Sequence, residues 1–483
     1  MHADADLTRR RFLLASAAVA LAACADQLDP SPRPSGSASA GTAVPESADA
    51  PARPSADATA SPLPADTPTP AASPRATAAP AAAPVRRLYR DGALADGRSE
   101  RLRVGVSVYV VDGVIEWIRP SDDEGGRGSR RGLEVIDASG ATIVPGMVDA
   151  HSHVTMPGGA HWIDRGLDAP SQMAAVAEAN GRLLTSAGVR WARDVGAPRG
   201  EDREDGRTRA LSLGIRDRWR ASGSRAYPHI RAAGTWLTRA NSLPDGLAVE
   251  VRDADALVAA AERQLDEGAD LVKLYLDGPD PRTAPWSAAE VRRVVRAVHG
   301  RGARVTAHAG RLAGARVGVA GGIDALEHGF ELDRDVAAEM ARRGTVLVST
   351  LAVFRSWLTF GRTTNQAQFR GNGASGIRER LETAEASVGL AARAGVPIAA
   401  GTDFGGGSLR ANQLAWEVES LVAAGLEPFE ALAAATWRGG ELLGEADAGV
   451  IREGGPADFF LVHGDPLSDP RALWRMWRVD WAG

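Results

Sequence analysis

The chain has 483 residues, enough for one large core together with a second, smaller domain. Hydrophobic residues make up 44% and charged residues 24% of it, as in an ordinary globular protein. The formal net charge of -5 provides no basic face, so nucleic acid is not expected as a partner.

The beginning of the chain is expected to direct export rather than to fold. Thr8-Arg-Arg-Arg-Phe-Leu-Leu14 is a basic stretch that enters an alanine-rich apolar run, which is too short to span a bilayer as a stable helix. The pattern resembles a twin-arginine signal, and Leu21-Ala-Ala-Cys24 resembles a lipobox. The resemblance implies that residues 1–24 are a Tat-type lipoprotein signal peptide, with cleavage before Cys24 and a lipid on its thiol. The protein would then be anchored on the outer side of the cytoplasmic membrane or in the periplasm.

Two further features belong to this end of the chain. Cys24 is the single cysteine, so neither a disulfide nor a cysteine metal site is expected. Residues 25–84 consist mainly of Pro, Ala, Ser and Thr and cannot bury enough apolar surface to offset their chain entropy. They are predicted to form a disordered linker, so the membrane would be contacted through the lipid anchor alone.

Short alternating runs broken by Gly and Asp predict antiparallel strands at both ends of the remaining chain. They cover residues 87–92, 104–118 and 133–136, and then residues 449–462 and 474–479. We therefore expect a small β-sandwich domain assembled from residues 85–141 and 446–483.

The stretch between these ends, residues 142–445, alternates strand and helix patterns. Strands are predicted at residues 142–148, 189–194, 230–235, 271–276, 304–307, 325–327, 345–350 and 397–402. Helical periodicity lies between them, for example at residues 253–267, 288–299 and 335–343. Eight such units predict the α/β class and a (β/α)8 TIM barrel, in which the active site lies at the carboxyl ends of the strands.

Chemically capable residues do fall where the predicted strands end. His151 and His153 are one residue apart at the end of the first strand, so both imidazoles share a face and can bind a divalent metal. Lys273 lies within an apolar strand, where burial should lower its pKa and make the amine nucleophilic. The later strands end at His308, His328 and Asp403.

Together these motifs resemble the amidohydrolase superfamily, and in particular its imidazolonepropionase-like and Xaa-Pro-dipeptidase-like branches. The resemblance covers residues 85–483 and includes Pro145-Gly-Met-Val-Asp-Ala-His-Ser-His153 and residues 454–462. It implies that Lys273 is carboxylated by carbon dioxide to a carbamate that bridges two metals. One metal would be held by His151, His153, Lys273 and Asp403, and the second by Lys273, His308 and His328. Zinc is the expected metal, with manganese, iron and cobalt as alternatives.

The resemblance implies a hydrolase of carbon–nitrogen bonds in a small amide, a cyclic amide or a dipeptide. Two metals about 3.5–4 Å apart would clamp a hydroxide and polarise a carbonyl. Asp403 would act as the general base and acid. Tyr275 shares a strand face with Lys273, so its hydroxyl could steady an oxyanion, although a core tyrosine is an equal alternative. A homo-oligomer stays open.

Several alternatives also stay open. Lys273 could extend to solvent, and His308 and His328 could be hydrogen-bonded core residues. A mononuclear deaminase would leave Lys273 structural and release His308 to the substrate oxygen. A non-catalytic anchored binding protein could keep the barrel without turnover.

Some positions have weaker expectations. Asp194 could orient a ligand or cap the next helix, and the second role is preferred. His161 could touch substrate, although a solvent-exposed position is preferred. Residues 235–242 lack the histidine that related loops carry, and residues 354–376 could form a lid.

Overall fold

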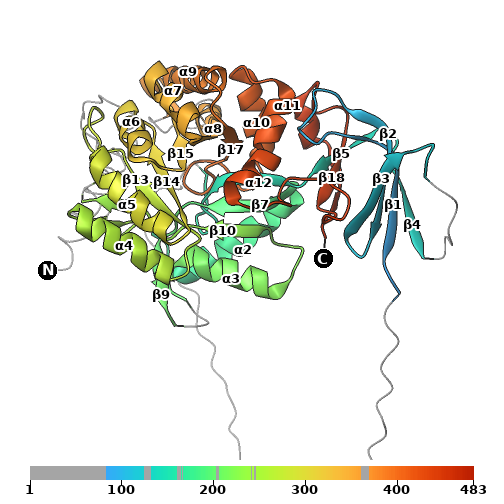
Figure 1. The fold of residues 1–483 in the computed structure, drawn as a ribbon, viewed down its shortest axis with the longest axis horizontal. Helices are drawn as coiled ribbons and strands as arrows, with labels where there is room; N and C mark the ends of the chain where they lie inside the picture. Colours follow the sequence, from blue (N-terminus) through green and yellow to red (C-terminus); the bar gives the residue numbers. More distant parts are fainter. Residues whose placement is uncertain are drawn as a thin grey trace, which may run out of the picture. The chain divides into compact units, whose positions relative to one another are not determined.

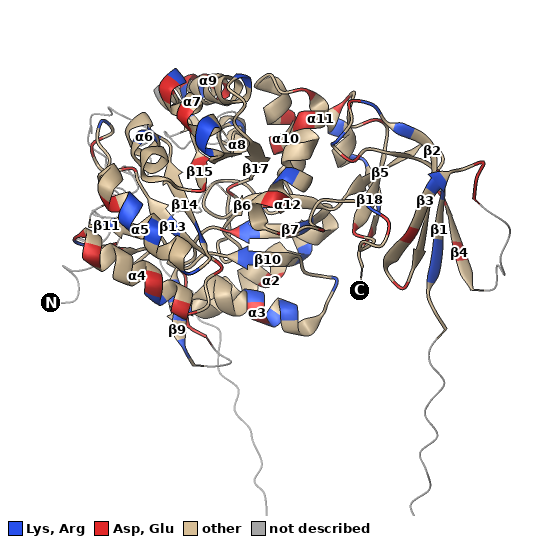
Figure 2. Ribbon diagram, viewed as in Figure 1, with Lys and Arg blue, Asp and Glu red and all other residues tan. Residues whose placement is uncertain are grey.

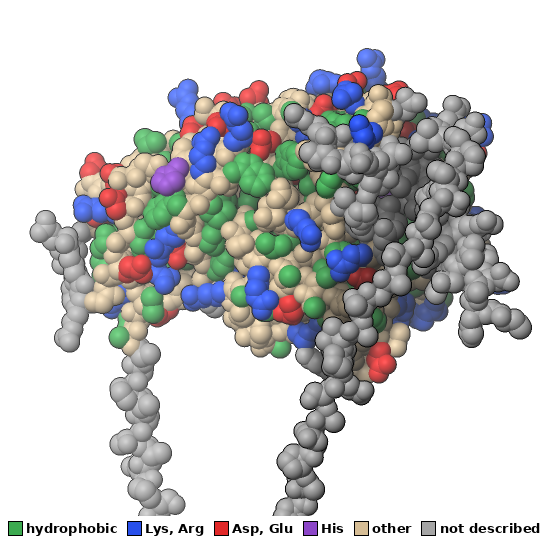
Figure 3. Space-filling model, turned by 180° about the vertical axis from the view of Figure 1, so that it is seen from behind, with side chains coloured by type: hydrophobic (Ala, Val, Ile, Leu, Met, Phe, Trp, Pro, Cys, Tyr) green, Lys and Arg blue, Asp and Glu red, His purple; other side chains and the backbone are tan. Residues whose placement is uncertain are grey.

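The computed structural model describes residues 83–124, 132–159, 165, 167–202, 206–240, 242–243, 246–360 and 369–482. The expected signal peptide with Cys24, the linker up to residue 82 and His161 lie outside these ranges. No helix in the described ranges is long and apolar enough to cross a membrane. Acidic and basic residues are interspersed along the described helices and strands (Figure 2), and their side chains are mixed with apolar ones on the face in Figure 3.

Strands from both ends of the chain pair in one mixed sheet of seven strands (Figure 1). Its order is β19-β18-β5-β1-β2-β3, and β4 pairs with β1. The first part of the chain provides β1 (Arg86–Leu94), β2 (Arg103–Val111), β3 (Val114–Pro120), β4 (Leu133–Asp137) and β5 (Ala141–Pro145), and the last part provides β18 (Phe459–His463) and β19 (Met476–Asp480). The predicted antiparallel hairpin over residues 104–118 is therefore confirmed as β2 and β3.

The outer strand β3 also meets the segment that leads into β18. The N–H of Ile115 donates to the carbonyl of Gly455 over 2.9 Å, and the N–H of Ala457 donates to the carbonyl of Gly113 over 2.7 Å. Beneath the sheet, the ring of Tyr89 packs edge-on against Phe459, with centroids 4.8 Å apart. The strand pairing joins all seven strands in one hydrogen-bonded sheet.

The middle of the chain forms an α/β fold with two parallel sheets. The first has the order β10-β7-β6, and the second has the order β12-β11-β13-β14-β15-β16-β17. Single parallel bridges join them, from Ala233 to Leu271 and from Ser152 to Phe404. The strands are β6 (Met147–Ser152), β7 (Val189–Asp194), β10 (His229–Ala232), β11 (Leu237–Arg239), β12 (Val249–Val251), β13 (Leu271–Tyr275), β14 (Arg304–Ala309), β15 (Ala325–His328), β16 (Val346–Ser349) and β17 (Ile398–Ala400).

Helices follow these strands and cover the sheets (Figure 1). They are α2 (Pro170–Ser186), α3 (Leu211–Ser222), α4 (Ala254–Asp266), α5 (Ala288–Gly300), α6 (Leu312–Gly321), α7 (Arg334–Arg343), α8 (Ala352–Phe360), α9 (Asn372–Arg393), α10 (Leu414–Ala423), α11 (Pro428–Ala434) and α12 (Trp437–Leu443). A short hairpin, β8 (Arg199–Glu201) and β9 (Thr208–Ala210), precedes α3, and a 3-10 turn, η3 (Pro470–Trp474), precedes β19.

Helix α5 illustrates why these segments are helical. Ser287 accepts the N–H of Glu290, and the Glu290 carboxylate accepts the N–H of Ser287 in return, so the first turn is capped from both sides. Four buried valines at helical spacing, Val291, Val294, Val295 and Val298, then face the core. The predicted helix at residues 288–299 is thus confirmed.

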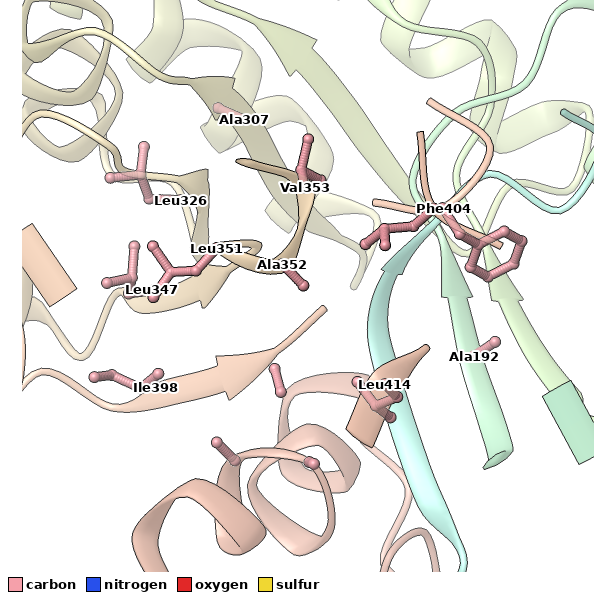
Figure 4. Packing of buried hydrophobic residues seen from close by; sticks show 14 of the residues in the cluster. Ala192, Ala307, Leu326, Leu347, Leu351, Ala352, Val353, Ile398, Phe404 and Leu414 are labelled. Atoms are coloured by element: carbon pink, nitrogen blue, oxygen red, sulfur yellow. The ribbon is translucent and has the colours of Figure 1, made fainter. Parts of the chain in front are cut away.

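The apolar layer between strands and helices is built from side chains in register. Leu326 of β15 pairs with Leu347 of β16, which pairs with Ile398 of β17, and the three lie together in Figure 4. All three are at most 2% exposed. Because side chains alternate along a strand, the neighbouring residues point to the other face, where the site described below lies.

Two sequence predictions are wrong in detail. Residues 133–136 were expected to pair antiparallel, but β4 pairs parallel with β1, because a parallel pair is set by strands that are not joined by a tight turn. Residues 142–148 were expected to form a single strand, but the structure divides them between β5, in the mixed sheet, and β6, in a parallel sheet. The division falls at Pro145 and Gly146. Proline offers no N–H, and a Cβ on Gly146 would lie only 2.8 Å from Cβ of Arg190 and 2.9 Å from Trp481. The chain can change sheets there because a glycine fits this gap.

Candidate metal centre

The residues singled out in the sequence gather at the carboxyl ends of the parallel strands. His151 lies in β6 and His153 just beyond it, Lys273 lies in β13, His308 lies in β14 and His328 ends β15. Asp403 follows β17. His328 and Asp403 have φ of 73° and 53°, in the left-handed region that residues other than glycine rarely adopt. Such backbone strain is typical of positions whose side chains must be aimed at a shared point.

Two histidines and one carboxylate converge most closely. Nε2 of His151 lies 3.3 Å, and Nε2 of His153 3.2 Å, from Oδ1 of Asp403. Potential ligand atoms of these three residues lie within 4.8 Å of one another, and they form the single such group of His, Cys, Asp and Glu found in the described ranges. His151 is 1% and His153 4% exposed, so the group is shielded from solvent.

The other ring nitrogen of each histidine is already occupied. Nδ1 of His151 lies 2.6 Å from Oε2 of Glu327, and Nδ1 of His153 lies 2.8 Å from the carbonyl oxygen of Gly196. Because both partners are acceptors, each Nδ1 carries the hydrogen and each Nε2 presents a lone pair. Two lone pairs and a carboxylate oxygen therefore face one another, an arrangement that a cation would stabilise.

Lys273 is buried on the same side of the sheet. It is 1% exposed, so its amine does not reach solvent, and its Nζ has no hydrogen-bond partner in the described part of the chain. Burial lowers the pKa of Lys273 to about 8, an effect that the nearby Glu327 carboxylate partly opposes. A buried amine without a partner is costly, so a group is needed to satisfy it.

His308 and His328 stand next to each other, with ring centroids 4.5 Å apart. Nδ1 of His328 lies 2.9 Å from Oγ1 of Thr350, which leaves Nε2 available. Nε2 of His308 lies 3.2 Å from Oδ2 of Asp277, which leaves Nδ1 available. Burial, and then the neighbouring His308, hold the pKa of His328 well below its ordinary value, so this ring is neutral at pH 7.

Tyr275 packs against this pair rather than standing alone. Its ring stacks on His308 with a centroid distance of 4.0 Å and an interplanar angle of 13°. Trp236, from the loop that lacks the expected histidine, lies 5.0 Å from the ring of His153. The wall beside His153 and His308 is therefore apolar, and it also includes Met156.

Two carboxylates that the sequence analysis did not single out support the site. Oδ1 of Asp149 accepts the N–H of Thr402 over 3.0 Å and the N–H of His151 over 3.2 Å, which ties β6 to the turn that carries Asp403. Asp277 accepts the N–H of Gly310 over 2.8 Å. Period-two spacing was the available signal, because Asp149 precedes His151 by two positions and Asp277 follows Tyr275 by two.

The third such carboxylate, Glu327, stands directly before His328 and is fully buried. Burial alone would raise its pKa, but the charges of Arg193 and Lys273 hold the pKa of Glu327 well below the ordinary value. No local pattern marked this residue, since its partners come from other strands.

Asp194 has a structural position. It accepts the N–H of Val154 over 2.8 Å, directly after His153, and the N–H of Gly196 over 3.2 Å. The N-cap of α3 is Ala210, so the preferred capping role for Asp194 is wrong. In residues 354–376, the described parts are residues 354–360 of α8, residues 369–371 and the start of α9, while residues 361–368 lie outside the described ranges.

Comparison with known proteins identifies the family. The amidohydrolase family model matches residues 142–480. An uncharacterized protein of Mycobacterium tuberculosis is 32% identical over 342 residues, which cover 69% of this chain and 82% of that protein. An imidazolonepropionase of Salinispora tropica is 26% identical over 389 residues, which cover 74% of this chain and 85% of the relative.

A solved structure has the same fold. A Xaa-Pro dipeptidase with bound methionine in its active site superposes with a TM-score of 0.70 and 23% identity, covering 82% of this chain and 98% of that one. The chain belongs to the amidohydrolase family, and it is a hydrolase that acts on carbon–nitrogen bonds.

Proposed function

We propose that this protein is a metal-dependent hydrolase of small amides, cyclic amides or dipeptides, with a binuclear site bridged by carboxylated Lys273. The observation that carries the proposal is the approach of three acceptor atoms, Nε2 of His151, Nε2 of His153 and Oδ1 of Asp403, beside a buried amine that lacks a partner. Three converging acceptors repel one another unless a cation lies among them. His308 and His328 then offer two further nitrogens for a second cation.

The residues fit such a metal pair. His151, His153, Lys273 and Asp403 would hold one ion, and Lys273, His308 and His328 the other. A carbamate on Nζ of Lys273 would replace an unsatisfied buried amine with an oxygen ligand, which removes the cost of its burial. When bound, divalent ions supply Lewis acidity toward a carbonyl oxygen and toward water. Zinc is the proposed metal because catalytic zinc sites typically use imidazole and carboxylate ligands, as are present here.

The chain's own residues would move the proton. The carboxylate of Asp403 would accept it from the attacking water and deliver it to the departing nitrogen. The hydroxyl of Tyr275 would donate to the oxygen of the scissile carbonyl as charge develops there, with its ring held by stacking on His308. The apolar wall around Trp236 would exclude bulk water from the same region.

The substrate class rests on similarity. The relatives include an imidazolonepropionase and, by fold, a Xaa-Pro dipeptidase, whose names describe a cyclic amide and a dipeptide. Residues 235–242 depart from the loop expected in these branches, so we propose the class of bond rather than one compound.

Metal content tests the proposal. The full chain would be produced with bicarbonate and a mixed supply of zinc, manganese, iron and cobalt, as wild type and as Lys273→Ala, and metal per chain would be measured. We expect two ions in wild type and one or none in the variant, together with turnover of a compound in an amide and dipeptide panel. A folded wild-type protein that binds no metal would overturn the proposal.

A second candidate is a mononuclear deaminase-type enzyme. The observation that favours it is that His151, His153 and Asp403 form the compact acceptor group, while Nε2 of His308 faces Asp277. In this case Lys273 is structural and His308 contacts the substrate oxygen. One ion in both wild type and Lys273→Ala would select this candidate.

We also propose the architecture and location that the sequence predicts. The single bridges at Ala233 and Ser152 would close β6, β7, β10 and β13 to β17 into a (β/α)8 barrel. The contact of β3 with residues 453–457 would fold the mixed sheet over itself as a small sandwich. Residues 1–24 would direct Tat export and lipidation at Cys24, and a homo-oligomer is compatible with this arrangement. Export of an Arg9→Lys, Arg10→Lys variant would contradict the Tat proposal.

A further inference from the structure

Glu327 is buried among the parallel strands, and its carboxylate accepts hydrogen bonds from residues on three other strands. Oε2 lies 2.6 Å from Nδ1 of His151 on β6, and Oε1 accepts Nη2 of Arg193 on β7 over 2.5 Å. The hydroxyl of Thr306 on β14 donates to the same Oε1. Glu327 is 0% and Arg193 3% exposed, so the pair is a buried ion pair with directed hydrogen bonds.

Arg193 holds more than this carboxylate. Its Nε donates to the carbonyl oxygen of Ala150 over 2.6 Å, and Ala150 directly precedes His151. One guanidinium therefore fixes both the backbone that carries His151 and the carboxylate that grips its ring. A buried ion pair is a weak source of stability, because desolvation offsets the attraction, so its geometry toward His151 needs a separate explanation.

Three histidines, His151, His153 and His328, have Nδ1 against a partner, and the three partners differ. His153 faces a backbone carbonyl at Gly196, and His328 faces the hydroxyl of Thr350. Among these three, His151 is the one whose partner is a carboxylate, and the fourth histidine, His308, faces the carboxylate of Asp277 through Nε2 at 3.2 Å. A carboxylate that accepts the Nδ1 hydrogen fixes the tautomer, orients the ring and makes Nε2 a stronger donor to a metal.

We propose that Glu327, held in place by Arg193, is a positioning residue that fixes His151 as an Nε2 ligand and sets its donor strength. The inference rests on the proposed metal site and adds to it a buried residue pair that orients one of its ligands. Loss of this contact is expected to change the metal affinity and the ligand field directly. Turnover is expected to change only as a result of those two effects.

The test compares two substitutions of equal chemistry in the full chain. Glu327→Gln keeps size and removes charge at the pair that grips His151. Asp458→Asn does the same at another buried ion pair, in which Arg190 lies 3.1 Å from Asp458 and which contacts none of the proposed ligands. Affinity for Zn2+ is measured by competition with a chromophoric chelator, and the visible spectrum is recorded with Co2+ bound. Stability is measured by unfolding in urea.

Glu327→Gln is expected to weaken Zn2+ binding by about 10- to 100-fold and to shift the Co2+ absorption. Asp458→Asn is expected to keep wild-type affinity and spectrum while it lowers stability. Wild-type affinity and an unchanged Co2+ spectrum in folded Glu327→Gln would overturn the inference and leave the proposed function intact. Absence of metal binding in wild type would overturn the proposed function itself.

A second variant covers the case in which Glu327→Gln does not fold. Arg193→Lys keeps the positive charge, but a single ammonium cannot span Glu327 and the carbonyl of Ala150 as the guanidinium does. Its Zn2+ affinity is expected to fall by on the order of tenfold. Wild-type affinity in Arg193→Lys would overturn the proposed role of the pair.

Discussion

Oδ1 of Asp403 lies 3.3 Å from Nε2 of His151, although Asp403 follows β17, the last strand of the parallel sheets, and His151 lies in β6, the first. Since Nδ1 of His151 donates to Glu327, both facing atoms are acceptors. The proposed metal ion would account for this distance, which a hydrogen bond between two acceptors would not. Four predictions test the site and the residues around it.

Asp403→Asn should abolish most turnover. The amide cannot accept the proton of the attacking water, so kcat is expected to fall by about 10²- to 10⁴-fold, the usual contribution of a general base. The measurement is kcat on whichever amide or dipeptide wild type hydrolyses, with metal content determined on the same preparation. A decrease of less than tenfold at equal metal content would contradict the assigned role.

Lys273→Met should affect the metal-free and metal-bound proteins in opposite directions. Without metal and carbon dioxide, the change removes a buried amine that has no partner, so the free energy of unfolding is expected to stay equal or rise by about 1–3 kcal/mol. With Zn2+, wild type should gain stability that the variant does not. Urea unfolding with and without chelator checks both arms. A metal-free variant much less stable than wild type would mean that the amine has a structural partner.

Gly401→Ala should disturb His151. A Cβ at position 401 would lie 2.4 Å from Cβ and 2.8 Å from the backbone nitrogen of His151, and neither atom can move away cheaply. Overpacking of this kind costs about 1–3 kcal/mol, and metal affinity should fall with it. Gly376→Ala in α9 is the matched control, because nothing lies within 4 Å of its Cβ, and it should stabilise by about 0.5–1 kcal/mol. Equal thermal stability and Zn2+ affinity of the two variants would be inconsistent with the packing described.

Glu417 should make stability depend on pH. It is fully buried, where it accepts the hydroxyl of Ser349 over 2.6 Å and the N–H of Ala352 over 2.7 Å. Burial raises the pKa of Glu417 from 4.5 to about 7, and the hydrogen bonds from Ser349 and Ala352 oppose this only in part. The native state thus binds a proton that the unfolded chain releases, so this contribution is fully present below pH 4.5 and is lost as pH rises toward 7.

The contribution is on the order of 3 kcal/mol for a shift of this size. Glu417→Gln cannot ionise, so its unfolding free energy should vary less than that of wild type between pH 4.5 and 7. Urea unfolding at several pH values measures this difference. Parallel curves for the two proteins would show that Glu417 has an ordinary pKa.

The sequence was informative wherever a pattern is local. Strand β7 matches the prediction at residues 189–194, and α5 differs from its prediction by one residue, because alternating and helical burial repeat within a few positions. The pairing of both chain ends in one sheet was also anticipated, since the alternating runs at each end could not bury their apolar faces alone. Local patterns could not reveal the switch between β5 and β6, which depends on the approach of Arg190 and Trp481 to Gly146.

By itself, the sequence determined which side chains meet at the site. Parallel strands bring their carboxyl ends to one edge, so residues at those ends, such as His151, Lys273 and His328, are expected to lie together there. Only the tertiary structure decided how they are aimed: Glu327 takes Nδ1 of His151, Asp277 faces His308, and a left-handed backbone turns Asp403 toward the histidines. Hydrogen-bond partners of this kind come from strands far apart in the chain, and their distances depend on packing that no local periodicity encodes.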